Sequence, residues 1–135
     1  MITDQRFRKS ERLCRKKYIE ELFRTGKSFY SFPFRLVWIP VSEPLVHPAQ
    51  ITISVKKRLF RKAVQRNLLK RRIREAYRKN KTELYLKLEE LNIQIVFILI
   101  YTASDIRSYL EIEEKIIIIL SRLKEELARS VYEGA

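Results

Sequence analysis

Thirteen Lys and Arg residues lie in one segment, residues 56–81, which reads KKRLFRKAVQRNLLKRRIREAYRKNK. The only acid in this segment is Glu75. Guanidinium groups form paired hydrogen bonds with phosphate oxygens, and ammonium groups attract them as point charges. Like charges one helical turn apart repel each other by about 0.2–0.5 kcal/mol per pair. A segment that tolerates this repulsion is typical of a protein that binds a polyanion.

The remainder of the chain is nearly neutral. The formal net charge is +13, of which residues 56–81 contribute +12, and the other residues comprise 16 basic and 15 acidic side chains. The positive charge is therefore local, which indicates a binding surface rather than a general means of staying in solution.

Residues 62–79 are predicted to form a helix with two stripes. Four residues, here called the apolar stripe, share an arc of about 100° when successive residues are placed about 100° apart: Leu69, Ile73, Ala76 and Tyr77. An adjoining arc, the basic stripe, holds Asn67, Lys70, Arg71, Arg74 and Arg78. The apolar stripe can pack against a sheet, which would turn the basic stripe towards solvent. Asn67 could then read a base edge or a ribose hydroxyl, and Arg66 would reach a ligand from the first turn.

Solvent, an anionic membrane and nucleic acid are the alternatives for what covers the basic stripe. Solvated helix faces usually mix charges of both signs, which this stripe does not do. Helices that lie on membranes often carry Trp or Phe on the apolar face, and the apolar stripe has neither. Nucleic acid is therefore favoured.

No constellation of catalytic or metal-binding residues stands out. There is no CxxC, HExxH or P-loop motif. The lone His47 is expected on a surface loop, and Cys14 is expected to be a buried structural thiol. Helical acids such as Glu11 are expected to be solvated partners of nearby Lys and Arg. We predict neither a catalytic residue nor a metal ligand.

The length of 135 residues and the apolar fraction of 46% predict a single domain over residues 1–135, with an ordered core at about residues 7–130. No apolar run is long enough to span a membrane, and the N-terminal residues lack the apolar region of a secretory signal. With a single cysteine and no export signal, the cytoplasm is the predicted location.

The elements that position the basic stripe are predicted from periodicity and turn signals. Helices are expected at residues 11–25, 62–79, 82–91 and 109–130, and strands at 28–40, 49–57 and 92–101. The almost continuously apolar 92–101 predicts a central strand covered on both faces. The fold class is therefore α+β, with a small sheet of three or four strands and helices packed on it.

The segment KAVQRNLLKRRIREAYR resembles the signature of the protein subunit of bacterial ribonuclease P. In that family an Arg-Asn pair, a Lys-Arg pair and an Arg-Glu pair follow one another on one helix, here at 66–67, 70–71 and 74–75. SVKKRLFRKAV, YIEELFRTGKSF and IQIVFILIY also resemble neighbouring parts of the family. The resemblance covers roughly residues 7–128.

The resemblance implies a two-layer α/β sandwich of the ribosomal protein S5-like type, with a left-handed βαβ crossover. It also implies a protein that binds a large catalytic RNA and helps it to remove the 5′ leader from precursor tRNA. The RNA would hold the catalytic Mg²⁺ ions and perform the hydrolysis, and no obligate protein partner is implied. The residues expected to contact the catalytic RNA are Lys62, Arg66, Asn67, Lys70, Arg71, Arg74 and Arg78.

In the family a separate cleft, between the sheet and the first helix, binds the single-stranded leader. Aromatic platforms beside basic side chains suit this task, because every base has a face that can stack. The candidates for this leader cleft are Tyr18, Phe23, Phe34 and Trp38, with Lys56 and Lys57. Each aromatic residue could instead belong to the core. Two positions depart from the family pattern: Ile19, where an aromatic residue is usual, and Arg61, where many members have glycine.

Two other functions remain as alternatives. A ribosomal or other structural RNA-binding protein would have a similar composition, and the spacing of the signature is what argues against it. A double-stranded DNA reader would normally pair its recognition helix with a short partner helix, whereas here a strand precedes the basic helix.

Overall fold

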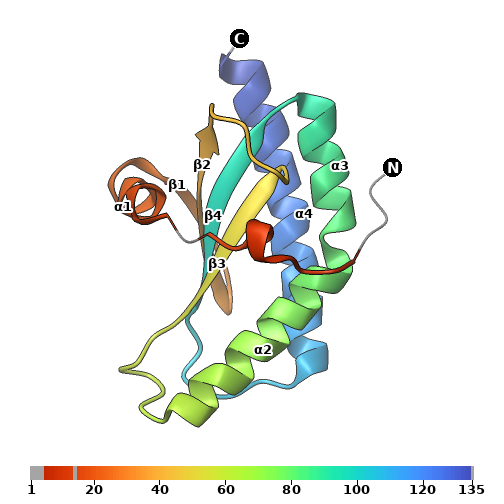
Figure 1. Cartoon of the computed structure of the whole chain (residues 1–135). Coiled ribbons are helices and arrows are strands. Elements are labelled where there is room, and N and C mark those ends of the chain that lie inside the picture. Colours follow the sequence, from red (N-terminus) through yellow and green to blue (C-terminus); the bar gives the residue numbers. More distant parts are fainter. Residues whose placement is uncertain (1–4, 14, 135) are drawn as a thin grey trace.

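The structure is a computed structural model that describes residues 5–13 and 15–134 (Figure 1). A short 3-10 helix, Lys9–Glu11, precedes the main elements. In chain order these are α1 Lys16–Thr25, β1 Lys27–Ser31, β2 Phe34–Val41, β3 Ala49–Val55, α2 Ala63–Asn80, α3 Thr82–Leu91, β4 Gln94–Tyr101 and α4 Tyr109–Gly134. Cys14 lies outside the described residues, so its predicted burial stays a prediction.

The four strands form one mixed sheet in the order β1-β2-β4-β3. β1 with β2 and β2 with β4 pair antiparallel, whereas β3 and β4 pair in parallel. The parallel pair requires a crossover, and α2 with α3 supplies it. The predicted α+β class and sheet size are therefore confirmed, whereas the left hand of the crossover stays a prediction.

Helices cover both faces of the sheet, with α2, α3 and α4 on one side and α1 on the other (Figure 1). β4 contributes to the cores on both faces, because its side chains alternate between the two faces of the sheet. Ile95, Phe97, Leu99 and Tyr101 belong to the larger core under α2 and α4, and Val96, Ile98 and Ile100 to the smaller core under α1. The prediction of a central strand at 92–101 is thus confirmed.

The strand predicted at residues 28–40 is wrong as a single element. The chain reverses at Phe32–Pro33, whose peptide bond is cis, so that Ser31 pairs with Phe34. Proline lacks a backbone N–H and favours turns, which explains why the aromatic run forms a hairpin of β1 and β2.

The helix predicted at residues 11–25 begins only at Lys16. The residues before it lie along the edge of β3, where the N–H of Leu13 donates to the carbonyl of Ile51 at 2.9 Å. At the other end, a Cβ on Gly26 would lie 2.3 Å from the Leu22 carbonyl oxygen and 2.5 Å from Val37 Cγ1. Glycine at this position therefore allows the end of α1 to approach β2 closely.

A buried ion pair fixes the N-terminal segment to the start of α3. Glu11 and Lys81 are only 1% and 2% exposed. Lys81 Nζ donates to Glu11 Oε1 and to the carbonyl of Arg6, and the Tyr85 hydroxyl also donates to Glu11 Oε1. The amide of Arg8 donates to Glu11 Oε2 at 2.6 Å. The expectation that Glu11 is a solvated helical acid is therefore wrong.

Candidate nucleic-acid interface

The apolar stripe of α2 is buried as predicted. Each of its four residues is fully buried: Leu69, Ile73, Ala76 and Tyr77. They join the larger core, where the Tyr77 ring meets Phe97 at a centroid distance of 5.9 Å. Because this side of α2 is buried, the adjoining side must face outwards.

The basic stripe lies on that outward side. Asn67 and Arg71 are exposed, and Lys70 and Arg74 are half-buried. The side chains of these four residues make no hydrogen bond or ion pair with another of the described residues. Their donors are therefore available to an external anion.

Arg78, the last residue of the basic stripe, is engaged within the protein. Its Nη2 lies 2.6 Å from Glu75 Oε1, and its Nε lies 3.1 Å from Glu75 Oε2. The hydrogen bond from Arg78 is the main cause that holds the pKa of Glu75 below its usual value. The single acid of the segment is thus neutralised locally and leaves the charges of Lys70, Arg71 and Arg74 uncompensated.

Arg66 has a structural task that the sequence did not reveal. Its Nη1 donates to the carbonyls of Phe60 and Arg61, at 2.7 and 2.9 Å. These bonds close the connector 56–62 onto the first turn of α2. Lys62, the residue before the helix, is exposed, as are Lys56 and Lys57.

The face of the sheet that carries α1 is only partly covered. Tyr18 and Leu22 of α1 pack on it with residues of β2 and β4. At the edge of this core lies one cross-strand row, which we call the open row: Tyr30, Arg35, Ser54 and the buried Ile100. Tyr30 is 51% exposed and Arg35 is also exposed. Strand β3 ends one residue after Ser54, so the row lies next to Lys56 and Lys57.

The residues proposed for the leader cleft fall in different places. Phe34 and Trp38 are buried on the opposite face, in the core under α4. Their prediction as cleft residues is wrong. Side chains alternate along β2, so that Arg35 points towards the α1 face while Phe34 and Trp38 point away from it. Tyr18 is only 6% exposed, whereas Phe23 is 66% exposed. Sequence reasoning missed Tyr30 and Arg35. The alternation of β2 separates Arg35 from Phe34 and Trp38, but it does not tell which of the two faces α1 covers.

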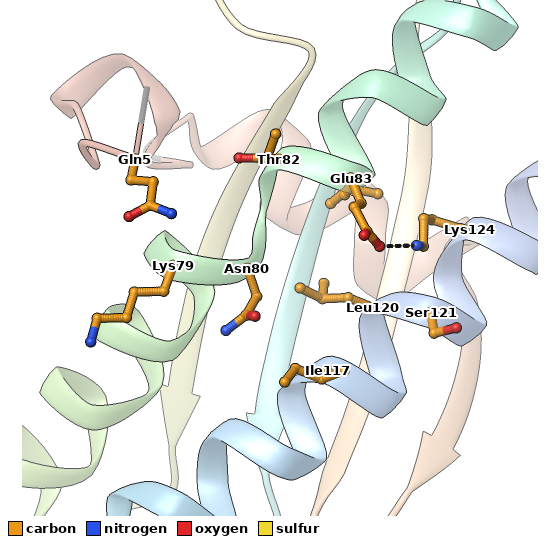
Figure 2. A pocket seen from close by; sticks show the side chains of 10 residues that line it. Gln5, Lys79, Asn80, Thr82, Glu83, Ile117, Leu120, Ser121 and Lys124 are labelled. Carbon is orange, nitrogen blue, oxygen red and sulfur yellow. Dashed lines mark hydrogen bonds and ion pairs between the residues drawn. The ribbon is translucent and has the colours of Figure 1, made fainter. Parts of the chain in front are cut away.

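A cavity of about 570 Å³ lies on the other side of the molecule, where α2, α3 and α4 meet (Figure 2). Figure 2 shows Glu83 of α3 and Lys124 of α4 joined across it, at 2.9 Å. Asn80 at the end of α2 donates to Glu113 of α4 at 3.1 Å. Asn80, Glu83 and Lys124 therefore join the three helices to one another.

Within residues 5–13 and 15–134, no group of three or more His, Cys, Asp or Glu side chains is arranged to hold a metal ion. None of the helices over this part of the chain is long and apolar enough to cross a membrane.

The fold and the basic stripe define a class: a small α+β protein with a cationic helix that is anchored on its sheet by a buried apolar stripe. The family model for Ribonuclease P matches residues 7–124. The chain therefore belongs to the ribonuclease P protein family. It is accordingly a subunit of the endoribonuclease complex that processes tRNA, and it works with the ribonuclease P RNA.

Individual relatives agree with this assignment. The ribonuclease P protein component of Porphyromonas gingivalis strain W83 is 37% identical over 105 residues, which cover 78% of this chain and 77% of that protein. A Staphylococcus aureus RNase P protein, a mutant with defective mRNA degradation activity, has a TM-score of 0.70 at 25% identity, covering 86% and 90% of the two chains. The Thermotoga maritima protein, at 24% identity, has a TM-score of 0.63, covers 83% and 96%, and shows the shared fold. These comparisons give no support to the ribosomal alternative.

Proposed function

We propose that the basic stripe of α2 binds the catalytic RNA of ribonuclease P while the open row binds the 5′ leader of precursor tRNA. The observation that carries the first part is the set of uncompensated donors on α2, held outwards by a fully buried apolar stripe. An anchored helix loses little backbone freedom on binding, which favours affinity.

The exposed aromatic residues of α1 and β1, and the cations in and beside the open row, support the second part. Phe23 on α1 and Tyr30 on β1 offer aromatic faces for stacking, and Arg35 on β2 offers a planar guanidinium cation. Single-stranded RNA is bound by this combination of stacking and backbone charge. In this proposal Phe23, Tyr30 and Arg35 replace Phe34 and Trp38, and Lys56 and Lys57 attract the leader phosphates.

The division of labour follows from the chemistry of the two partners. RNA offers phosphate oxygens, which are ligands that Mg²⁺ favours. We therefore place the magnesium ions of the assembled particle mainly on the RNA, which performs the hydrolysis. The protein would position the substrate and screen the repulsion between two RNA backbones. Precursor tRNA is the proposed substrate, and the cytoplasm the proposed location.

Reconstitution tests the proposed function directly. The purified chain is mixed with bacterial ribonuclease P RNA at low Mg²⁺, and removal of the 5′ leader from precursor tRNA is measured. We expect the chain to restore processing that the RNA alone performs poorly, because added cations offset RNA–RNA repulsion. Binding without restored processing would favour a purely structural RNA-binding protein.

Replacement of Phe23 by Ala should weaken binding of leader-bearing precursor tRNA to the assembled particle by about ten-fold, since base stacking contributes about 1–3 kcal/mol per base. Binding of mature tRNA should not change. Tyr132→Ala is the matched control, because Tyr132 is 80% exposed near the far end of α4. Equal losses for precursor and mature tRNA would remove Phe23 from the leader site.

A further inference from the structure

A second cationic feature lies where α2 meets the N-terminal segment. A hollow of about 210 Å³ opens where the N-terminal segment, β3 and α2 meet. Its floor is apolar and includes Ile51 and Ile53 of β3. A water molecule takes about 30 Å³ in the liquid, so the hollow has room for a phosphate group.

Three cations from two separate elements line this hollow. Lys70 and Arg74 come from α2, and Arg12 comes from the N-terminal segment. Among residues 5–13 and 15–134, no acid lines the hollow with them and none forms an ion pair with any of the three. Burial, and after it the charge of Arg12, lower the pKa of Arg74. The two guanidinium groups are thus close enough to repel each other, without a counter-charge from the described part of the chain.

The backbone of Arg12 is held in position, and its exposed side chain lies over one aromatic ring. Its backbone forms a parallel bridge with Ile51 at the edge of β3. Its guanidinium lies 5.5 Å from the centroid of the Phe7 ring, which also lines the hollow. The preceding residue is Glu11, whose buried ion pair with Lys81 fixes this segment to α3. Such preorganisation suits a binding site, because little freedom remains to be lost.

We propose that Arg12, Lys70 and Arg74 together bind one phosphodiester group of an RNA backbone. The inference rests on the proposed function and adds a binding residue and a discrete site to it. A phosphate between the three side chains would relieve their mutual repulsion and accept hydrogen bonds from both guanidinium groups. The phosphate belongs either to the catalytic RNA or to the leader of precursor tRNA, and both sources share this chemistry.

The test uses Arg12→Gln in the full-length chain, with Lys9→Gln as the matched control. Glutamine retains an uncharged polar side chain with an aliphatic stem and removes the charge. Lys9 is an exposed cation of the same segment that does not line the hollow. Thermal unfolding of each variant establishes that the fold is kept. Binding to ribonuclease P RNA alone forms the first arm, and processing of precursor tRNAs with long and one-nucleotide leaders forms the second.

Loss of one charged hydrogen-bonded contact should weaken binding by about ten-fold. A ten-fold loss in the first arm for Arg12→Gln, but not for Lys9→Gln, supports the site and assigns its phosphate to the catalytic RNA. A loss confined to long-leader substrates supports the site and assigns it to the leader. In an Arg74→Gln background the effect of Arg12→Gln should shrink to about two-fold, because residues that share one partner are coupled.

If Arg12→Gln changes neither RNA binding nor the processing of precursor tRNAs, the proposed site is wrong. It is also wrong if the losses of binding from Arg12→Gln and Arg74→Gln are fully additive. The wild-type chain distinguishes these results from failure of the proposed function. If wild type binds and activates the RNA, the function stands without the site. If wild type does neither, both proposals are wrong.

Discussion

Simultaneous replacement of Lys70, Arg71 and Arg74 by Ala should weaken binding to ribonuclease P RNA by on the order of one hundred-fold at about 0.15 M salt. Each cation that neutralises an RNA phosphate releases a condensed counterion, and log K falls with log[salt] by about 0.7–0.9 per contact. The slope of the triple variant should therefore be shallower by about two units. The fold should persist, because none of the three makes an ion pair with the described acids.

Binding is measured at several salt concentrations, and unfolding by circular dichroism. The matched control removes three exposed cations from α1 and α4: Lys16, Arg24 and Arg129. It changes the net charge equally but leaves the basic stripe intact. Arg66 is deliberately kept, since its loss would also release the carbonyls of Phe60 and Arg61. An unchanged salt slope, or equal weakening by the control, would count against the basic stripe as the RNA-binding surface.

Lys81→Met should destabilise the folded chain by about 3–5 kcal/mol, because it leaves a buried carboxylate without its cation. Glu11 would keep only the Tyr85 hydroxyl and the Arg8 amide as donors. The free energy of unfolding is measured by urea titration. Combination with Glu11→Leu should recover part of the loss, since an apolar pair removes the orphaned charge. Lys87→Met, a half-buried surface lysine of α3, is the control.

The same ion pair predicts a pH dependence of stability. Burial would raise the pKa of Glu11, but hydrogen bonds from Lys81, Tyr85 and the Arg8 amide, with the charge of Lys81, hold it below the ordinary 4.5. The folded state therefore favours the carboxylate. The ionised Glu11 contributes its full stabilisation at pH values above its pKa in the unfolded chain. This contribution is lost as the pH falls towards its lower pKa in the folded chain. Wild type should lose more stability than Glu11→Gln on acidification from about pH 6 to pH 3, and parallel curves would contradict this assignment.

Local periodicity was enough to predict the elements that carry the interface. A 3.6-residue repeat on α2 separated a buried side from an outward one, and Leu69 and Ile73 are buried accordingly. The uninterrupted apolar run of β4 predicted a strand covered on both faces. Both patterns repeat within a few residues, so they are readable from one sequence without knowledge of the fold.

Features that depend on partners distant in sequence were not predictable in this way. Glu11 and Lys81 are separated by 70 residues, and neither shows a local sign of burial. The assignment of Phe34 and Trp38 failed because period-two alternation gives two faces but does not tell which face the helix α4 covers. The hollow around Arg12 likewise appears only when the N-terminal segment is placed beside α2.

The strand order has a consequence for folding during synthesis on the ribosome. β4 is the last strand to be synthesised, yet it lies between β2 and β3. Until residue 101 has emerged, β3 lacks its neighbour, and only the β1–β2 hairpin can pair. Helix α2 thus leaves the exit tunnel before β4 is available to bury its apolar stripe. Closure of the sheet must wait until β4, at residues 94–101 of 135, is available, so shorter nascent fragments expose apolar and strongly charged surface together.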